Sequence, residues 1–176
     1  MNFYGLDIMS NSFVAILMGS ESDLTIMQFA ADILKQLQIN YEIKITSAHR
    51  TPSVTQAYIS DAQERGCKVF ISGAGLAAHL AGATAAHTTV PVIGVPIDSG
   101  PLSGLDALLS TVQMPAGIPV ATVAIGKTGA KNAAYLAAQI LSLSDTGLAE
   151  RVKAERVANS EKVQAQDKAL QDSLSQ

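Results

Sequence analysis

The chain alternates between short apolar-patterned runs and longer segments in which apolar residues recur every three or four positions. Apolar runs of this length are typical of strands that are buried on both faces of a sheet. The three-and-four spacing is typical of helices that bury one side. Strands are predicted at residues 13–18, 41–46, 68–72, 92–95 and 121–125, and helices at about 22–38, 53–65, 77–87, 104–113 and 129–143.

Strand–helix units repeated in this way predict an α/β protein. Parallel strands joined by right-handed helical crossovers place helices on both faces of one sheet. We therefore expect a three-layer α/β/α sandwich with a parallel, flavodoxin- or Rossmann-like sheet. The pattern sets this class and leaves the order of the strands open. Ligands bind such sheets at the carboxyl ends of the strands, so the turns that follow the strands are the places where chemistry is expected.

The strand–helix units define one predicted catalytic domain at residues 13–143, preceded by an N-terminal extension at residues 1–12. Residues 144–176 differ, because they are charged, favour helix and carry few apolar side chains. Such a segment cannot enclose a core of its own. We expect an extended C-terminal helix that packs on a neighbouring subunit to about residue 160, with disorder or loose helix beyond.

Composition bears on the partners of the protein. Charged residues make up only 15% of the chain and hydrophobic residues 48%, which predicts that another subunit covers part of the surface. The net charge of −3, without clustered Lys and Arg, argues against a nucleic-acid partner. No run of about 18 apolar residues is present, which argues against a membrane span.

The single cysteine, Cys67, excludes an internal disulfide and favours a reducing compartment. Cys67 precedes an apolar run and is expected to be a small buried packing residue. The first dozen residues contain Asp7 and no basic segment, so they do not have the pattern of a secretory signal. These features predict a soluble, cytoplasmic protein.

The segment from Ser47 to Pro52 carries the most informative residues. Thr51 and Pro52 suit the N-cap and the first position of a helix, so His49 and Arg50 lie in the turn after a predicted strand. An imidazole titrates near neutral pH, and a guanidinium is a permanent cation. The pair predicts proton-transfer chemistry on an anionic small molecule.

The turn after the first predicted strand is Gly19-Ser20-Glu21-Ser22-Asp23. Ser20 or Ser22 is expected to cap the following helix by accepting hydrogen bonds from its first amides. Free amides and hydroxyls at a helix N-terminus also bind phosphate, so the same turn predicts an anion site. Asp23 beside it can accept hydrogen bonds from ribose hydroxyls.

The segment at residues 72–82 is rich in small residues. Gly73, Gly75 and Ala78 have the spacing of a dinucleotide-binding fingerprint, and Asp98 follows Gly73 by about 25 residues, as a ribose-binding acid does. That fingerprint normally belongs to the first strand–helix unit rather than the third, so nicotinamide or flavin binding is a minor alternative. We favour a role in which the small residues let a planar ring or a one-carbon unit approach the backbone closely.

Two other histidines and one lysine motif complete the candidates. His79 lies in the same small-residue segment and is either a hydrogen-bonded structural residue or part of the site, whereas His87 is expected to be structural or exposed. Three histidines without clustered carboxylates or further cysteines do not make a metal site, so we expect no metal. Gly126-Lys127-Thr128 is similar to the end of a phosphate-binding loop, but Ala121 stands where that motif requires glycine.

The segments with candidate chemistry, and one further pair, are Gly19-Ser20-Glu21-Ser22-Asp23, Ser47-Ala48-His49-Arg50-Thr51-Pro52, Gly73-Ala74-Gly75 with Ala77-Ala78-His79-Leu80, and Leu102-Ser103-Gly104-Leu105-Asp106 with Val112-Gln113-Met114-Pro115. In this order and spacing they resemble the PurE family over about residues 13–143. The Ser-Ala-His-Arg-Thr-Pro form resembles class I, the 5-(carboxyamino)imidazole ribonucleotide mutases of purine biosynthesis, rather than the class II carboxylases. The chain departs from the pattern at Leu76, where glycine or methionine is usual, and at Asp98-Ser99-Gly100-Pro101, where Gln-Ser-x-Ala is more common.

The resemblance implies a reaction that needs no metal, nucleotide or organic cofactor. The implied substrate is a small-molecule ribonucleotide whose aminoimidazole carries a carbamate on its exocyclic nitrogen, and the enzyme moves that carboxyl group to a ring carbon. The resemblance assigns His49 as the general acid and base. It also implies a homo-octamer with active sites near subunit junctions and the C-terminal helix packed on a neighbour.

The resemblance further implies which residues bind the substrate. Phosphate contacts are implied for Ser20, Ser22 and Arg50, and ribose contacts for Asp23. The pockets for the ring and for carbon dioxide are implied to be lined by Ser47 and Ala48 and by Gly73, Ala74, Gly75, Ala78, His79 and Leu80, respectively. Two alternatives stay open: a class II-type carboxylase that uses carbon dioxide directly, and a non-catalytic nucleotide- or flavin-binding module.

Overall fold

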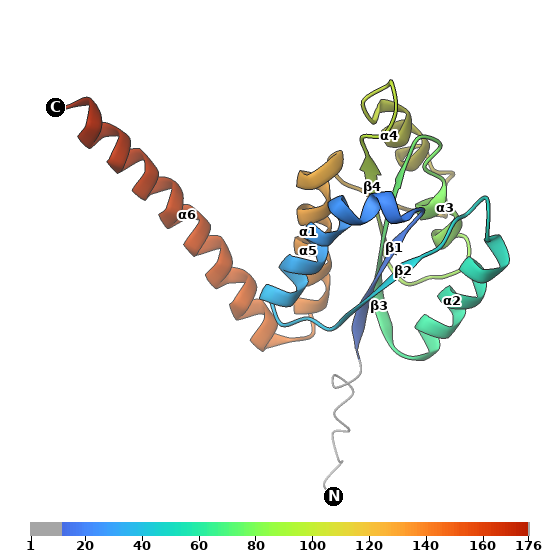
Figure 1. Cartoon of the computed structure of the whole chain (residues 1–176). Helices are drawn as coiled ribbons and strands as arrows, with labels where there is room; N and C mark the ends of the chain where they lie inside the picture. The colour runs from blue at the N-terminus through green and yellow to red at the C-terminus, as the bar shows by residue number, and fades with distance from the viewer. Residues whose placement is uncertain (1–11, 176) are drawn as a thin grey trace, which may run out of the picture. The chain divides into compact units, whose positions relative to one another are not determined.

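The computed structural model describes residues 12–175 and shows a five-stranded parallel sheet with helices on both faces (Figure 1). This architecture confirms the predicted α/β/α sandwich. Apart from Ser12, the predicted N-terminal extension lies outside the described residues. The strands are β1 (Phe13–Met18), β2 (Tyr41–Ile45), β3 (Cys67–Gly75), β4 (Val92–Ile97) and β5 (Ala121–Thr122).

The strands lie in the order β2-β1-β3-β4-β5, and each neighbouring pair is parallel. In the register of the sheet, Ile16 of β1 lies opposite Ile43 of β2 and Ile71 of β3. Every residue of β1 is buried, which explains its uninterrupted apolar sequence. The chain leaves β1 toward β2 and then crosses back to β3, so the strand order reverses between β1 and β3. Such a switch point opens a crevice at the carboxyl ends of the strands.

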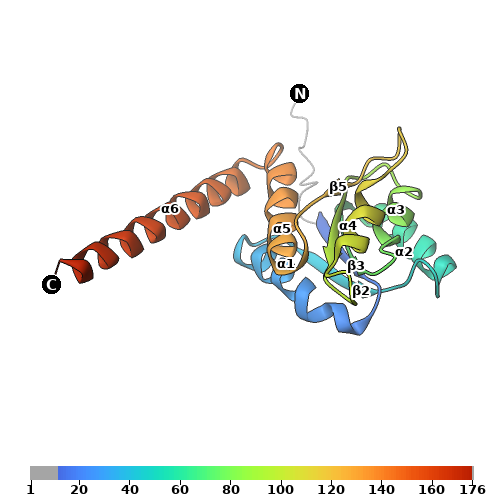
Figure 2. The same cartoon turned by 90° about the horizontal axis from the view of Figure 1, so that it is seen from above.

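Helices cover both faces of this sheet (Figure 2). One face carries α1 (Leu24–Gln36) and the N-terminal part of α5 (Gly126–Ser142), and the other carries α2 (Pro52–Glu64), α3 (Leu80–Ala85) and α4 (Leu105–Val112). A short 3-10 helix, Glu21–Asp23, leads into α1. Within residues 12–175, no helix has both the length and the apolar composition needed to cross a membrane.

The single cysteine lies at the start of β3. Cys67 is buried, as expected, among core residues that include Phe70 and Ile59. Burial raises the pKa of the Cys67 thiol to about 11, because the thiolate would lose its hydration. The side chain therefore acts as a small packing residue with little thiolate at neutral pH.

The third strand–helix unit differs from the prediction in its boundaries. Pairing with β4 carries β3 through Gly75, three residues beyond the predicted end at Ser72. The following helix therefore begins at Leu80 rather than near Ala77. The small residues that the sequence analysis placed in a turn thus lie partly inside the sheet, and this changes what they can bind.

The fifth strand is shorter than predicted. β5 ends at Thr122 rather than at residue 125, because it pairs only with Ile93 and Gly94 of β4 before the chain bends into α5. The bend brings two backbone segments together: a Cβ atom on Gly129 would lie 1.6 Å from the carbonyl oxygen of Ala124. Only glycine permits this approach.

Residues from Ala138 onward form a second compact unit, which contains the end of α5 and helix α6 (Thr146–Leu174). Asp145 caps α6, since its Oδ1 accepts a hydrogen bond from the backbone N–H of Leu148 at 2.8 Å. The helix continues without a break past residue 160 to Leu174. Its packing on a neighbouring subunit stays a prediction. The large apolar side chains along its length that are more than half exposed are Val157, Val163, Leu170 and Leu174.

Candidate active site

The turn after β1 is held by a reciprocal capping arrangement. Ser20 is the N-cap of the short helix: its Oγ accepts from the backbone N–H of Ser22 at 3.4 Å, and the Asp23 carboxylate accepts from the N–H of Ser20 at 3.1 Å. This capping box confirms Ser20 as the predicted cap. It gathers two hydroxyls and the first amides of a helical segment at the carboxyl end of the central strand. Such a corner favours an anion.

Arg50 joins this corner from the turn after β2. Its Nη2 donates to the carbonyl oxygen of Gly19 at 2.7 Å, and its backbone N–H donates to Oγ of Ser47 at 3.1 Å. The guanidinium is therefore anchored across the turns that follow β1 and β2. Nη1 makes no hydrogen bond to the described residues and can bind an anionic ligand.

Asp23 is a nearly buried carboxylate at the floor of the same corner. Burial raises the pKa of its carboxyl above the ordinary aspartate value, because the charged form loses water. The backbone N–H groups of Ser20 and Gly19, and the charge of Arg50, act against this shift. In its ionised form the carboxylate is an oriented acceptor, suited to hydroxyl groups of a ligand.

Three threonine hydroxyls support the turn that carries His49 and Arg50. Thr46 and Thr55 are buried, and their Oγ1 atoms lie 2.6 Å apart. Thr51 occupies the predicted N-cap position of α2, but its hydroxyl accepts from the backbone N–H of Ser47 at 2.9 Å rather than from the helix. The sequence analysis missed this network, whose members are ordinary turn and helix residues until the fold brings them together.

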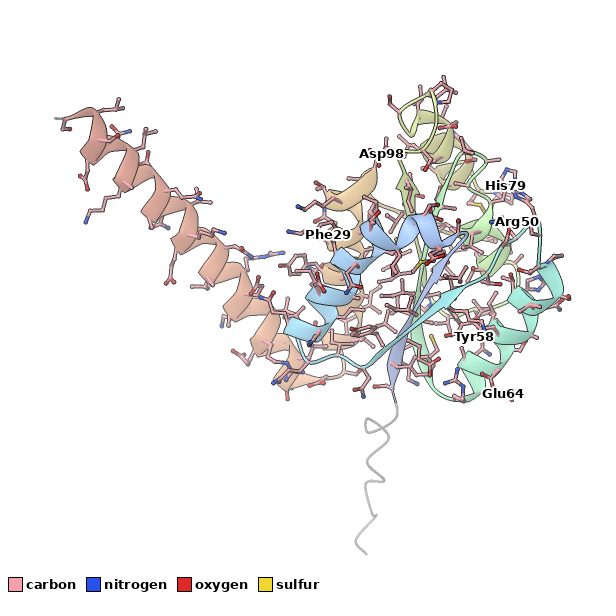
Figure 3. All side chains as sticks on the ribbon, viewed as in Figure 1. Phe29, Arg50, Tyr58, Glu64, His79 and Asp98 are labelled. Atoms are coloured by element: carbon pink, nitrogen blue, oxygen red, sulfur yellow. The ribbon has the colours of Figure 1, made fainter. Side chains whose placement is uncertain are left out.

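His49 and His79 form a directly hydrogen-bonded pair. Nε2 of His49 lies 2.8 Å from Nδ1 of His79, and the ring centroids lie 4.9 Å apart with the planes at 78°. His49 follows β2 and His79 follows β3, so the strand order brings together two residues 30 positions apart. In Figure 3, Arg50 and His79 lie close together at the same edge of the sheet. Because one nitrogen of the pair must carry the shared hydrogen, each ring constrains the tautomer of the other.

A cleft of about 510 Å³ lies between these turns. It brings together most of the residues named from the sequence: Ser20, Ser22, Asp23, Ser47, Ala48, His49, Arg50, Ala74, Gly75, His79 and Leu80. Lining residues that the sequence analysis did not name as site residues are Gly19, Leu76, Ala77 and Ser99. A signal for Ser99 was present, because it follows β4 at the same edge of the sheet.

Two of the named residues lie outside the lining. Gly73 is buried in β3, where a Cβ atom would lie 2.3 Å from Sδ of Met27 in α1. Ala78 is buried, and its backbone N–H donates to Oγ of Ser110 in α4 at 3.0 Å. Both residues therefore support the wall of the cleft from behind.

The geometry argues against a dinucleotide site. Gly73 and Gly75 belong to β3 itself, whereas the fingerprint places its glycines in the turn between strand and helix. Asp98 is not part of the cleft; its Oδ1 lies 3.0 Å from the Cβ position of Gly126, at the start of α5, and Figure 3 shows it well apart from His79. The described part of the chain holds no group of three or more His, Cys, Asp or Glu side chains suited to a metal.

The two remaining sequence candidates also lie outside the cleft. His87 is exposed, at the other end of the sheet from His79. Lys127 of the Gly126-Lys127-Thr128 motif places its Nζ 4.3 Å from the ring centroid of Phe29. This cation–π contact gives the lysine a packing role on α1.

Fold and site together define a class: a doubly wound α/β protein with hydroxyl, amide and guanidinium groups and an imidazole pair gathered at its switch point. The model of the AIR carboxylase family matches residues 13–162. The chain belongs to this family. The match begins with β1 and extends beyond the residues whose motifs carry the resemblance.

The chain is similar to known proteins in sequence and in structure. The chain is 58% identical over 143 residues to the N5-carboxyaminoimidazole ribonucleotide mutase of Bacillus subtilis; the aligned region covers 81% of this chain and 88% of that protein. It is 53% identical over 150 residues to the mutase of the same name from Escherichia coli K12, covering 85% and 89%. The crystal structure of Treponema denticola PurE superposes with a TM-score of 0.82 at 34% identity, covering 90% of this chain and 98% of that one.

Proposed function

We propose that the chain is an isomerase of purine biosynthesis that converts 5-(carboxyamino)imidazole ribonucleotide to 4-carboxy-5-aminoimidazole ribonucleotide. Proteins named N5-carboxyaminoimidazole ribonucleotide mutase are more than half identical to the chain over most of its length. The observation that carries the proposal is the His49–His79 pair, hydrogen bonded at 2.8 Å beside an anchored Arg50 in one cleft. This geometry combines a proton carrier with an anion site.

The anion corner binds the sugar phosphate of the substrate. Ser20 and Ser22 donate through hydroxyl and amide groups, and Arg50 supplies the permanent positive charge. The buried Asp23 carboxylate accepts hydrogen bonds from the ribose hydroxyls. These contacts fix the five-membered ring over Ser47 and Ala48, so that the reaction takes place on an oriented substrate.

His49 carries the proton in both halves of the reaction. In the first half, the bond between the exocyclic nitrogen and the carbamate carbon breaks, carbon dioxide leaves, and the nitrogen takes a proton from the imidazolium of His49. In the second half, the ring carbon attacks carbon dioxide to form a C–C bond, and neutral His49 removes the proton from that carbon. A positioned acid–base group of this kind contributes about 10²–10⁴-fold to the rate.

His79 and the small residues of β3 complete the site. The bond between Nε2 of His49 and Nδ1 of His79 orients the catalytic ring and constrains its tautomer. Ala74, Gly75 and Leu80 leave a small, mostly apolar space next to the pair, in which carbon dioxide stays close to the ring until it is recaptured. No cofactor takes part in either half of the reaction.

The assembly is proposed to be a cytoplasmic homo-octamer. Helix α4 buries Ala107 and Thr111 but leaves Leu105, Leu109 and Val112 about half exposed on another side. Leu109 also borders a hollow that reaches His49 and His79. A second copy of the chain on this apolar face would therefore enclose the histidine pair and exclude water from it.

The direct test follows turnover of the carbamate substrate by its ultraviolet absorbance in both directions. The proposal predicts interconversion of the two carboxylated ribonucleotides without added bicarbonate, metal or cofactor. Turnover only of aminoimidazole ribonucleotide, dependent on carbon dioxide, would instead indicate a class II-type carboxylase. Binding without turnover, or flavin absorbance in the purified protein, would indicate a nucleotide- or flavin-binding module.

A further inference from the structure

Leu76, directly after β3, has a backbone conformation that leucine rarely adopts. Its φ angle is +55°, in the left-handed region where a side chain crowds its own backbone. The side chain is half exposed, so burial in the core does not explain why this conformation is kept. A strained residue that persists at the rim of a cleft indicates a local function.

The side chain of Leu76 fits against a glycine of the segment that follows β4. A Cβ atom on Gly100 would lie 2.6 Å from Cδ2 of Leu76, far inside contact distance. Gly100 itself has a φ of +78°. Leu76 thus occupies a space that exists only because residue 100 has no side chain.

In a second contact the roles of the two strands are exchanged, because a side chain after β4 packs on a glycine of β3. Ser99 rests on Gly75: a Cβ atom on Gly75 would lie 2.6 Å from Oγ of Ser99 and 2.7 Å from its Cβ. Gly75, Leu76 and Ser99 all line the cleft that contains His49 and Arg50. Two reciprocal contacts, Leu76 on Gly100 and Ser99 on Gly75, therefore join the ends of β3 and β4.

The segment that carries Leu76 is fixed on its other side by α4. Oγ of Ser110 accepts from the backbone N–H of Ala78 at 3.0 Å and donates to the carbonyl oxygen of Asp106 at 2.7 Å. Leu76 is therefore held between an anchored segment and the chain after β4. In this position its side chain can fix where the segment after β4 lies relative to the segment after β3.

We propose that Leu76 is a positioning residue that places the Ser99 hydroxyl in the cleft as a hydrogen-bond partner for the anionic ribonucleotide. The inference rests on the proposed function only in that the substrate occupies this cleft. Ser99 is the residue that touches the substrate, and Leu76 acts through it. Leu76 fills the space left by the missing side chain of Gly100, and this contact sets how close residues 98–101 lie to the cleft.

The first experiment measures the kinetics of Leu76→Gly, Ser99→Ala and the double variant. Leu76→Gly should raise KM about fivefold, the cost of losing one ordered contact, and leave kcat nearly unchanged. Its melting temperature should not fall, because glycine relieves the left-handed strain. Ser99→Ala should raise KM similarly, and the double variant should be no worse than either single one, since both remove the same contact.

The second experiment tests the contact itself without reference to activity. Gly100→Ala introduces two sources of strain, an alanine at positive φ and a collision of its Cβ with Leu76. Gly117→Ala is the matched control: its φ is +92°, but no atom lies within 4 Å of its Cβ position, so it introduces only the backbone strain. The melting temperature of Gly100→Ala should therefore fall further than that of Gly117→Ala. In the Leu76→Gly background the difference between them should disappear.

The outcomes separate this inference from the proposed function. An unchanged KM in Leu76→Gly, with a raised KM in Arg50→Ala, overturns the positioning role of Leu76 and keeps the substrate in the cleft. Additive KM increases in the Leu76→Gly, Ser99→Ala double variant overturn the claim that Leu76 acts through Ser99. An unchanged KM in all of these variants places the substrate elsewhere and overturns both proposals.

Discussion

The imidazole of His49 provides both proton transfers of the proposed reaction. We expect His49→Asn to retain the folded assembly and to bind the ribonucleotide, because the anion corner does not depend on this side chain. Its kcat should fall by at least about 10²-fold, the usual contribution of a positioned general acid–base group. Calorimetric binding together with steady-state turnover measures both effects.

His87→Asn is the matched control for this variant, because it makes the same change at an exposed histidine outside the cleft. Its turnover should equal that of the unchanged enzyme. Near-normal kcat in His49→Asn would remove His49 from the proton-transfer role. A loss of equal size in both variants would point to a general effect of histidine replacement.

Asp23 predicts a dependence of substrate binding on pH. Burial raises the pKa of this carboxyl above the ordinary aspartate value, so acidification protonates it at a higher pH than it would an exposed aspartate. Protonation removes an acceptor for the ribose hydroxyls, and KM should rise as the pH falls through that pKa. Asp23→Asn should show a raised KM at neutral pH and no further rise on this acid limb. An identical acid limb in the variant would assign the titration to another group.

Site residues that can be recognised from their immediate neighbours in the chain were predicted from the sequence. Contacts between segments far apart in the chain were not. Ser20 is recognisable as a cap and His49 as a turn residue because strand, turn and helix are adjacent in the chain. The bond from His49 to His79 depends on the strand order, which the hydrophobic pattern does not contain. Gly73 has the same local signal as Gly75, yet it also pairs with Met18 of β1 and lies against Met27 of α1, which buries it behind the cleft wall.

At the scale of elements, the contact between Gly129 of α5 and the chain after β5 is the least tolerant of change. A Cβ atom there would lie 1.6 Å from the carbonyl oxygen of Ala124, a backbone atom that cannot move aside as a flexible side chain can. Gly129→Ala should lower the free energy of unfolding by about 3 kcal/mol or more. Urea denaturation at a fixed protein concentration measures the loss.

Gly147→Ala in α6 is the control for that substitution. Its Cβ position has ordinary contacts, 3.4 Å to Oδ1 of Asp145 and 3.5 Å to Nη1 of Arg151. Because alanine favours helix over glycine, this variant should be as stable as the parent or slightly more stable. Equal stability of the Gly129 and Gly147 variants would show that the bend after β5 is free to relax.

The helices and strands themselves were largely predictable, and their ends were not. Pro52 and Gly66 mark the two ends of α2 through their own conformational preferences, so that helix was predicted within a residue. The end of β3 depends on how far its partner β4 extends, and the end of β5 on where the chain bends away from β4 into α5. Neither is visible in the local sequence of the strand itself. The departures at Leu76 and at residues 98–101 were visible separately, but their contact appears only in the folded chain.

At the scale of the whole molecule, we predict that the number of subunits in the assembly depends on α6. Four large apolar side chains along this helix are more than half exposed in the single chain. We expect truncation after Leu143 to yield a smaller assembly by light scattering, with the circular dichroism of a folded α/β protein. An assembly of unchanged mass would show that α6 does not pack on a neighbouring subunit.

Composition predicts an assembly but does not locate its surfaces. The low fraction of charged residues is a property of the whole chain, whereas the apolar side of α4 is defined by which of its residues the sheet buries. Leu105, Leu109 and Val112 are about half exposed, whereas Ala107 of the same helix is buried. The proposed enclosure of the histidine pair by a second copy is therefore an inference from structure.

The central claim is that His49 reaches the reacting atoms of an aminoimidazole ring held by its phosphate. A crystal structure with the bound ribonucleotide tests it most directly. We predict a ring nitrogen of His49 at about 2.6–3.2 Å from the exocyclic nitrogen or from a carboxyl oxygen of the ligand, directly or through one water. A ligand whose phosphate lies away from Ser20 and Arg50, or whose ring lies beyond that reach of His49, would contradict the account.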